Sequence, residues 1–318
     1  MSAVSLAIDI GGSKCVVGLV DDQGDVLAKR RFVWQALNEQ AMLEDIFREG
    51  RALVKEHPAL SPAFIGASIP GLADPEKGLW VEASFSGIRD LPIAAALSEG
   101  FHLPAYIDND GQACALAERL FGAGRDVDDF LYITVSNGIG GSIFANGRLY
   151  GGANGTAGEF GHCTVVEDGR PCKCGLTGCL EAHAAGPAIA RNYQELGGAP
   201  LPDGKAADAA EIARRARAGE ESALQAFRLE GMYLGKIIAT ACNLLNPAKV
   251  ILGGGVSLAF PLFEASLWET VHKHLYRTAN PGLQILPTPL GYDGGLLGAA
   301  AVGFSRYERA GMCGKGTF

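Results

Sequence analysis

The sequence predicts an α/β fold made of two domains with a duplicated design. A strand-forming run broken by a glycine-rich turn opens the chain, LAIDIGGSKCVVGLVDDQGDVLAKRRF, and a similar run returns at 130–151, FLYITVSNGIGGSIFANGRLYG. In each half, strand patterns come first and helical patterns follow, as is typical of α/β proteins. We interpret the two hairpins as the starts of duplicated domains that face one another. A chance resemblance between two glycine-rich hairpins is the alternative.

The first half contains strands and helices in a clear order. Leu6, Ile8 and Ile10 alternate with smaller or polar residues, as in a strand, and DDQGD is typical of a hairpin turn. Apolar residues at helical spacing predict a helix over 40–57. AFIGASIPGLAD predicts a buried strand that ends in a Pro-Gly turn, and AYIDND predicts a short strand that leads into the helix GQACALAERLFG.

The second half is richer in helices. Beyond residue 184, helical patterns dominate in AAEIARRARAG and in the apolar stretch ESALQAFRLEGMYLGKIIATACNLLNP. AKVILGGG predicts a strand, and GLLGAAAVGFSRYERA predicts a final helix. We therefore expect a smaller N-terminal domain over 1–118 and a larger C-terminal domain over 119–295 that carries a metal-binding loop. The C-terminal helix, about 296–318, is expected to pack back on the first domain.

The composition limits the class of protein. Hydrophobic residues make up 48% and charged residues 19% of the 318 residues, as in a globular protein. The net charge of −8 argues against a nucleic-acid-binding surface. Neither a signal peptide nor an apolar run of membrane-spanning length is visible. Eight cysteines without a secretion signal indicate metal ligation in a reducing compartment. We predict a cytoplasmic protein without a nucleic-acid or membrane partner.

The first glycine-rich turn is a candidate phosphate site. Gly11, Gly12, Ser13 and Lys14 stand between two predicted strands, which excludes the P-loop and the dinucleotide fingerprint, because both precede a helix. Such a turn can still direct backbone N–H groups at phosphate oxygens. Asp9, at the strand end, could hold Mg²⁺ through water. The alternative is a plain hairpin turn.

Two further glycine clusters favour a nucleotide. Gly138, Gly140 and Gly141 form a second turn that could bind a polyphosphate opposite the first. Gly254 and Gly255 follow the buried strand KVIL, where the backbone could approach a base or a ribose. ATP is the simplest ligand that uses all three clusters.

The sequence Asp108-Asn109-Asp110 ends a predicted strand and begins a helix. Phosphoryl transfer from ATP to a hydroxyl needs a carboxylate that orients the hydroxyl and accepts its proton, and Asp110 or Asp108 could do this. Adjacent Asn and Asp side chains also suit the hydroxyls of a sugar. The alternative is a helix N-cap, for which both residue types are favoured.

A metal site is predicted by the pattern H-x9-C-x-C-x4-C. Its residues are His162, Cys172, Cys174 and Cys179. Three thiolates and one imidazole complete a tetrahedral zinc, so no position stays open for a reacting water, and the zinc is expected to be structural. It would fix the loop that carries Glu159, His162 and Glu181. Cys163 is expected to point away from His162 along a strand. Reduced cysteines without a metal are the alternative.

These residues resemble the ROK sugar kinases (repressor, open reading frame, kinase). DIGGSK, the Asn-Asp pair before Gly111, GTAGEFGH and CKCGLTGCLE occur in the family's order, and the resemblance spans nearly the whole chain. It implies a duplicated actin-like ATPase (ribonuclease H-like) fold, with two domains flanking a cleft. It also implies ATP-dependent phosphorylation of a hexose or N-acetylhexosamine with Mg²⁺, a structural Zn²⁺ and a homodimer.

The resemblance also assigns roles to single residues. Asp110 resembles the base that accepts the proton of the sugar hydroxyl. The residues that resemble ligands of the other sugar hydroxyls are Asn109, Glu159, His162 and Glu181, with His162 also binding zinc. The first phosphate motif matches Gly11, Gly12, Ser13 and Lys14, and the second matches Gly138, Gly140 and Gly141. Glu159 favours glucose-like or N-acetylglucosamine-like acceptors, since related N-acetylmannosamine kinases can carry His there.

Three departures from the family pattern bear on the acceptor and the nucleotide. Asn137 stands where Thr is common, ASFSG at 83–87 differs from the usual residues near the sugar, and EAHAAG at 181–186 lacks a common serine. The last two leave the identity of the sugar open. His183 is expected to be a surface or core histidine rather than a sugar ligand.

A regulator and a sugar sensor are the competing functions. Related repressors carry a helix-turn-helix domain before the DIGG-like strand, and with Asp9 as the ninth residue we expect no such domain here. A sugar sensor without catalysis is disfavoured because Asp110 and the glycine turns are present.

Overall fold

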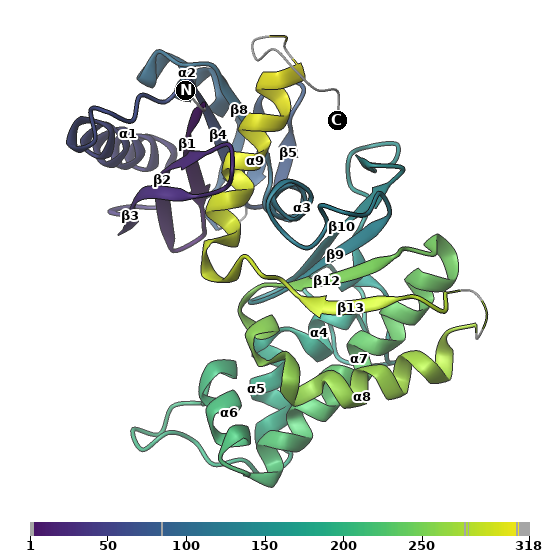
Figure 1. Cartoon of the computed structure of the whole chain (residues 1–318). Helices are drawn as coiled ribbons and strands as arrows, with labels where there is room; N and C mark the ends of the chain where they lie inside the picture. Colours follow the sequence, from purple (N-terminus) through teal and green to yellow (C-terminus); the bar gives the residue numbers. More distant parts are fainter. Residues whose placement is uncertain (1–2, 84, 277, 279, 310, 312–318) are drawn as a thin grey trace. The chain divides into compact units, whose positions relative to one another are not determined.

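The computed structural model describes residues 3–83, 85–276, 278, 280–309 and 311. It consists of two compact units (Figure 1). Unit 1 comprises Met1–Asp126 and Tyr292–Phe318, and unit 2 comprises Val127–Gly291. The division predicted between residues 118 and 119 lies inside a helix, α3 (Asp110–Leu120). The last part of the helix predicted over 296–318, like Ser84 of the ASFSG segment, lies outside the described residues.

Unit 1 is built on a five-stranded sheet of order β3-β2-β1-β4-β8. β1 (Val4–Ile10), β2 (Lys14–Asp21) and β3 (Val26–Val33) form an antiparallel meander, as the first sequence pattern predicts. β4 (Phe64–Ile69) and β8 (Ala105–Asn109) add to β1 in parallel. The carboxyl ends of β1, β4 and β8 therefore meet at one edge of the sheet.

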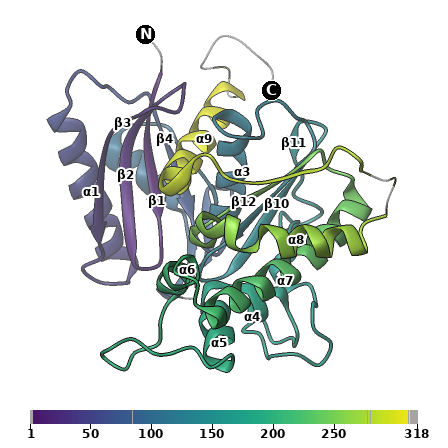
Figure 2. The same cartoon turned by 60° about the horizontal axis from the view of Figure 1, so that its bottom comes forward.

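Helices cover both faces of this sheet, as Figures 1 and 2 show. α1 (Glu39–Glu56) and α2 (Ile93–Phe101) bury apolar residues against one face, in a core that includes Ile65, Ala67 and Ile69 of β4. α9 (Gly294–Arg309) and α3 lie on the other face. α9 approaches β4 so closely that a Cβ on Gly66 would meet the Ala299 carbonyl oxygen at 1.9 Å, so only glycine fits there.

A small antiparallel sheet, which the sequence patterns did not predict, completes unit 1. It consists of β5 (Leu72–Asp74), β6 (Leu79–Ala83) and β7 (Ile88–Leu91). Each strand is three to five residues long, too short for an alternating pattern to stand out. The described residues 85–87 of the segment ASFSG lie between β6 and β7 in the sequence.

Unit 2 repeats the strand order of unit 1. Its sheet runs β11 (Arg148–Leu149), β10 (Ile139–Ala145), β9 (Phe130–Val135), β12 (Lys249–Gly253), β13 (Gln284–Pro287). The first three strands are antiparallel, and β9, β12 and β13 are parallel. Each unit thus has a meander followed by two parallel strands, which confirms the duplicated design expected from the two hairpins.

The helices of unit 2 share one core with this sheet. They are α4 (Leu180–Ala184), α5 (Gly186–Glu195), α6 (Ala209–Arg217), α7 (Glu221–Leu245) and α8 (Phe260–His274). The core joins Leu131 and Ile133 of β9 to Phe227 of α7 and Phe263 of α8. The strand expected around Cys163 is wrong: this segment is a short 3-10 helix, η1 (Phe160–His162), and Cys163 ends it.

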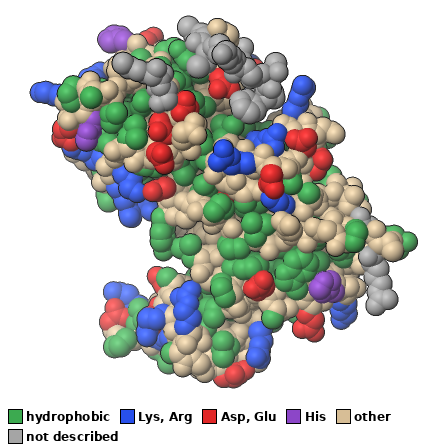
Figure 3. All heavy atoms as spheres, viewed as in Figure 1, with side chains coloured by type: hydrophobic (Ala, Val, Ile, Leu, Met, Phe, Trp, Pro, Cys, Tyr) green, Lys and Arg blue, Asp and Glu red, His purple; other side chains and the backbone are tan. Residues whose placement is uncertain are grey.

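Charged side chains of both signs lie on the visible surface of each unit. Figure 3 shows Lys and Arg side chains interspersed with Asp and Glu on this face of each unit, rather than gathered into one basic area. Within the described part of the chain, every helix is either too short or too polar to cross a bilayer.

Candidate functional site

The carboxyl ends of three parallel strands bring the acidic residues of unit 1 together. Asp9 of β1 pairs in register with Ser68 of β4, and Ser68 pairs with Asp108 of β8. Asn109 is the last residue of β8, and Asp110 is the first residue of α3. This edge of the sheet therefore carries both the candidate magnesium residue and the candidate base.

The first glycine turn joins β1 to β2 beside these residues. Gly11 N–H donates to the Lys14 carbonyl oxygen at 2.9 Å, which closes the turn, and Gly12, Ser13 and Lys14 are exposed. Burial, and next the negative charge of Asp110, raises the pKa of Asp9 to about 6. A carboxylate held near another carboxylate favours a cation that offsets both charges. Asp9 therefore fits a magnesium ion beside the exposed turn.

Asn109 and Asp110 are held in place by backbone groups. The Asn109 side chain caps α3 by accepting from Gly111 N–H at 2.9 Å, and its Nδ2 donates to the Gly71 carbonyl oxygen at 2.7 Å. Asp110 Oδ1 also accepts from Gly111 N–H at 2.9 Å, while the residue itself is exposed. The helix-capping alternative is thus correct for Asn109, and it leaves the Asp110 carboxylate at the surface in a fixed orientation.

Asp108 has a different environment from Asp110. It is only 3% exposed, and its Oδ1 accepts from Asn109 N–H at 2.9 Å. Burial raises its pKa to about 6. A carboxylate enclosed in this way is poorly placed to reach a substrate hydroxyl, so the geometry favours Asp110 of the two candidates.

In unit 2, the second glycine turn joins β9 to β10 and is crossed by the segment GEFG. A Cβ on Gly161 would lie 2.0 Å from the Ile139 carbonyl oxygen, and one on Gly141 would lie 2.4 Å from the Phe160 ring. Glycine at both positions lets the two segments touch. This contact sets Glu159 and His162 beside the second turn.

The third glycine cluster lies next to the second turn within unit 2. Gly253, the last residue of β12, pairs with Thr134 near the end of β9. Gly254 has a φ of 79° and accepts from the Ser257 hydroxyl at 2.7 Å. A Cβ on Gly255 would meet nothing within 4 Å, so this residue faces open space. The third cluster is therefore exposed at Gly255, beyond a strand end that neighbours the end of β9.

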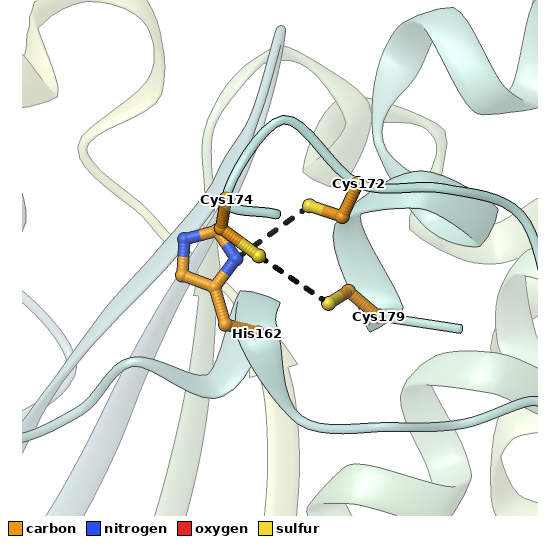
Figure 4. A group of neighbouring side chains, drawn as sticks. All are labelled: His162, Cys172, Cys174 and Cys179. Carbon is orange, nitrogen blue, oxygen red and sulfur yellow. Dashed lines mark hydrogen bonds between the residues drawn. The ribbon is translucent and has the colours of Figure 1, made fainter. Parts of the chain in front are cut away.

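The four predicted metal ligands converge, as Figure 4 shows. The ligand atoms of His162, Cys172, Cys174 and Cys179 all lie within 4.8 Å of one another. The Cys174 and Cys179 sulfurs are 3.7 Å apart, and His162 Nδ1 is 3.8 Å from Cys172 Sγ. Zinc–sulfur bonds of about 2.3 Å at tetrahedral angles place two sulfurs roughly 3.8 Å apart. The group therefore has the chemistry and the spacing of a structural zinc site.

The loop between these ligands is a compact knuckle. Cys172 N–H donates to the Leu176 carbonyl oxygen at 2.8 Å, and Gly178 N–H donates to the Arg170 carbonyl oxygen at 2.8 Å. Gly175 and Gly178 have φ values of 93° and 75°, which confirms that these glycines shape the turn.

The two ring nitrogens of His162 face different groups. Nδ1 faces the cysteines, while Nε2 lies 3.8 Å from Oε2 of Glu159, whose side chain is 59% exposed. A histidine that binds a metal through one nitrogen is commonly oriented by a carboxylate at the other. One imidazole can thus belong to the metal group and to the surface that Glu159 forms.

Glu181 connects the metal group to the second glycine turn. Its Oε2 accepts from Ile139 N–H at 3.0 Å, and its Oε1 lies 3.9 Å from Cys172 Sγ. A Cβ on Gly138 would lie 2.6 Å from the same Oε2, so a larger residue there would shift the Glu181 carboxylate. Sequence reasoning assigned Glu181 to the sugar and missed this link, because no local pattern relates residues 138 and 181.

His183 and Cys163 lie outside the metal group. His183 is 5% exposed, and its Nε2 accepts from Arg170 N–H at 3.1 Å, as expected for a core histidine. Burial, and next the Arg170 charge, lowers the pKa of His183, which keeps the ring a neutral acceptor. Cys163 is exposed at the end of η1.

Comparison with known proteins places this arrangement in a family. The model of the ROK family matches residues 5–304. The chain belongs to the ROK family. It is 33% identical over 309 residues to a glucokinase of Halalkalibacterium halodurans, with 92% of each chain covered. It is 27% identical to the transcriptional regulator NagC of Escherichia coli, over 90% of this chain and 72% of the regulator.

A solved relative confirms the fold of this ROK protein. It resembles the crystal structure of a ROK family glucokinase from Streptomyces griseus in complex with glucose and AMPPNP, with a TM-score of 0.82 and 29% identity. The similarity covers 95% of this chain and 99% of the other. Together with the repeated strand order, it confirms the actin-like ATPase fold expected from the sequence.

Proposed function

We propose that this protein is a sugar kinase that transfers the terminal phosphoryl group of ATP to a hydroxyl of a hexose or N-acetylhexosamine. Glucose and N-acetylglucosamine are the favoured acceptors. The observation that carries the proposal is the exposed, oriented Asp110 carboxylate at the strand edge that also bears Asp9 and the first glycine turn. A glucokinase at 33% identity over 92% of both chains supports it.

The acceptor hydroxyl is activated by Asp110. Phosphoryl transfer needs little covalent chemistry from the protein, so its residues position the hydroxyl and accept its proton. Asp110 orients the hydroxyl and takes the proton as the oxygen–phosphorus bond forms. The side chains proposed to bind the other hydroxyls are those of Asn109, Glu159, His162 and Glu181.

The nucleotide is held by the glycine turns. The backbone N–H groups of the first turn, with Ser13 and Lys14, and those of Gly138, Gly140 and Gly141 bind phosphate oxygens. Gly254 and Gly255 approach the nucleoside. Asp9 would hold Mg²⁺ through water, and the ion would offset phosphate charge during transfer. The ionised form of Asp9 is needed for this role.

The cysteine–histidine group holds a structural zinc. With four protein ligands the zinc would have no open position, so it would supply no water for the reaction. The zinc would keep Glu159, His162 and Glu181 in fixed positions for the sugar.

A coupled assay of ADP release tests the proposal. Purified protein with Mg·ATP is screened against hexoses, N-acetylhexosamines and a no-sugar control. We expect release that depends on one of these sugars and on Mg²⁺. No sugar-dependent release from a folded, zinc-loaded protein, across the whole panel, would contradict the proposed function.

A sugar-responsive regulator is the second candidate, because the chain is 27% identical to NagC. The net charge of −8 argues against it, since DNA binding relies on a basic surface. Sequence-specific retardation of promoter DNA in a gel shift would favour the regulator. The homodimer expected from the resemblance stays a prediction, which light scattering can test.

A further inference from the structure

The first glycine turn has a neighbour that none of the sequence motifs includes. Trp34 directly follows β3, and its indole Nε1–H donates to the Gly11 carbonyl oxygen at 2.8 Å. The side chain is 8% exposed. The donor thus comes from a buried ring beneath a turn whose own residues Gly12 and Ser13 are exposed.

This hydrogen bond fixes the direction of one peptide group. In a trans peptide, the carbonyl of Gly11 and the N–H of Gly12 belong to one plane and point in opposite directions. Because the indole holds the carbonyl on the buried side, the Gly12 N–H points to the exposed side. The Gly12 N–H has no acceptor among the residues that the structure describes.

Trp34 is itself rigidly supported. Phe32 packs edge-on against its ring, with ring centroids 5.4 Å apart. The next residue, Gln35, donates its N–H to Oδ2 of Asp45 at 3.0 Å, and Asp45 is buried in α1. The indole is therefore anchored through its own ring and through the following backbone to the core of unit 1.

Phe85 also lies beside Gly12. A Cβ on Gly12 would lie 3.7 Å from the Phe85 ring. Glycine has access to many backbone conformations, so a Gly-Gly turn would sample several peptide orientations if nothing held it. Trp34 and Phe85 restrict this freedom.

We propose that Trp34 is a positioning residue for the nucleotide: its indole N–H holds the Gly11–Gly12 peptide in the orientation that donates the Gly12 N–H to a phosphate oxygen. This inference rests on the proposed function, because it concerns the same phosphate turn. Orientation before binding reduces the entropy that is lost when the phosphate is captured. The indole needs no contact with the nucleotide for this effect.

The chain supplies a matched control in Trp80. Its Nε1–H also donates to a backbone carbonyl, that of Pro70, at 2.8 Å, and its side chain is 1% exposed. Trp34→Phe and Trp80→Phe each remove one buried indole donor in unit 1. Only the first removes a donor to the glycine turn, and Phe at position 80 keeps an aromatic ring beside Phe85, whose ring centroid lies 6.1 Å from that of Trp80.

The experiment measures equilibrium binding by titration calorimetry in the full-length protein. Mg·AMPPNP and adenosine are titrated into wild type, Trp34→Phe and Trp80→Phe. We expect Trp34→Phe to weaken AMPPNP about three- to tenfold and adenosine by less than about twofold, since one hydrogen bond is lost and only phosphate uses it. Trp80→Phe should leave both affinities within about twofold of wild type.

The outcomes separate this inference from the proposed function. Equal AMPPNP affinity in Trp34→Phe and Trp80→Phe, or an equal loss for adenosine and AMPPNP in Trp34→Phe, would overturn the role of Trp34 while leaving the kinase intact. Wild-type protein that binds no AMPPNP would contradict the kinase itself. If Trp34→Phe does not fold, the benzothiophene analogue of tryptophan is placed at position 34. Its sulfur replaces the N–H group, so the donor is removed while the ring shape is kept. The same titrations with this variant then test the role of Trp34.

Discussion

Asp108, near the end of β8, and Asp110, at the start of α3, show how two positions along the chain change the environment of a carboxylate. Asp108 points into the fold and is 3% exposed, whereas Asp110 is exposed and is oriented by Gly111 N–H. Sequence reasoning left both open as the base, because a D-N-D motif does not reveal which carboxylate is enclosed. Burial distinguishes them, and each can be tested by the same substitution.

Asp110→Asn should abolish most turnover. Asn keeps an oxygen that can accept from Gly111 N–H, so the local fold survives while the negative charge and the proton acceptor are lost. We expect kcat to fall by about 10²–10⁴ or more, with sugar affinity nearly unchanged. Steady-state kinetics and sugar titration check this, and near-normal turnover in Asp110→Asn would rule out the role.

Asp108→Asn is the matched control, and it makes a prediction about stability. The folded-state pKa of Asp108 is raised from 3.8 to about 6, so the folded protein binds more protons than the unfolded chain between these values. Its contribution to stability is therefore present below pH 3.8 and is lost as the pH rises through about 6. Asn has no charge and so lacks this pH dependence, and the stability of Asp108→Asn relative to wild type should therefore rise by about 2 kcal/mol between pH 4.5 and pH 7.

Urea unfolding of wild type and Asp108→Asn at pH 4.5 and pH 7 measures this difference. The gain should be larger at pH 7, and kcat should stay within about tenfold of wild type. A loss of turnover as large as that of Asp110→Asn would instead identify Asp108 as the base.

Glu159→Gln tests the sugar contacts. A charge-assisted hydrogen bond contributes about 1.5–3 kcal/mol, so its loss should raise the sugar KM by roughly 10–100-fold. The KM for ATP should stay nearly constant, because Glu159 belongs to the segment proposed for the sugar. An equal rise in both KM values would indicate a folding defect.

At the scale of elements, the cysteine–histidine group connects two segments of unit 2. It carries Glu159 and His162 on one side, and through Glu181 it contacts the second glycine turn at Ile139 N–H. Cys172→Ser should lose the metal and lower sugar affinity strongly. Because Glu181 also orients the turn, AMPPNP affinity should fall as well, by a smaller factor. Elemental analysis and calorimetry of Cys172→Ser measure all three quantities.

Cys163→Ser is the control for this prediction. Cys163 is adjacent to His162 but lies outside the metal group, so the substitution should leave the zinc and both affinities unchanged. Metal-free Cys172→Ser protein with unimpaired sugar binding would contradict the structural role proposed for the zinc. If such protein bound sugar normally but did not turn over, the zinc would instead be catalytic.

Elements with a clear local sequence pattern could be predicted from the sequence. The two meanders, α1, α7 and the strand leading into α3 follow from apolar spacing and turn residues. The convergence of the cysteine–histidine group could be predicted because the spacing of its residues is a property of one continuous segment. What could not be predicted are contacts between distant segments, namely Trp34 with Gly11 and Glu181 with Ile139. Cys163 was misplaced because a 3-10 helix of three residues leaves no pattern.

At the scale of the whole molecule, the chain contains two separate apolar cores. One lies in unit 1 around β1, β4 and α1, and the other in unit 2 around β9, α7 and α8. Each core contains buried acidic groups that the sequence did not reveal as such. In unit 2, Glu230 is such a residue: it lies within α7 and is 0% exposed.

Glu230 limits the stability of unit 2. Neither carboxyl oxygen has a hydrogen-bond partner among the residues that the structure describes, and burial raises its pKa well above the ordinary value. The folded state thus keeps Glu230 neutral while the unfolded chain ionises near pH 4.5. The contribution of Glu230 to stability is therefore fully present below that pH, and about 1.4 kcal/mol of it is lost per pH unit as the pH rises toward the raised pKa.

Glu230→Met should remove this dependence. Methionine is similar in length and has no charge to bury, so the variant should be more stable than wild type at pH 7 by about 1–3 kcal/mol, and the difference should shrink toward pH 4.5. Glu221→Met, in the same helix, replaces a side chain that is 70% exposed and should change stability by less than about 0.5 kcal/mol. Thermal and urea unfolding at several pH values compare the three proteins. A destabilised Glu230→Met variant at pH 7 would mean that the carboxyl group has a partner in solution, which contradicts its isolation in the core of unit 2.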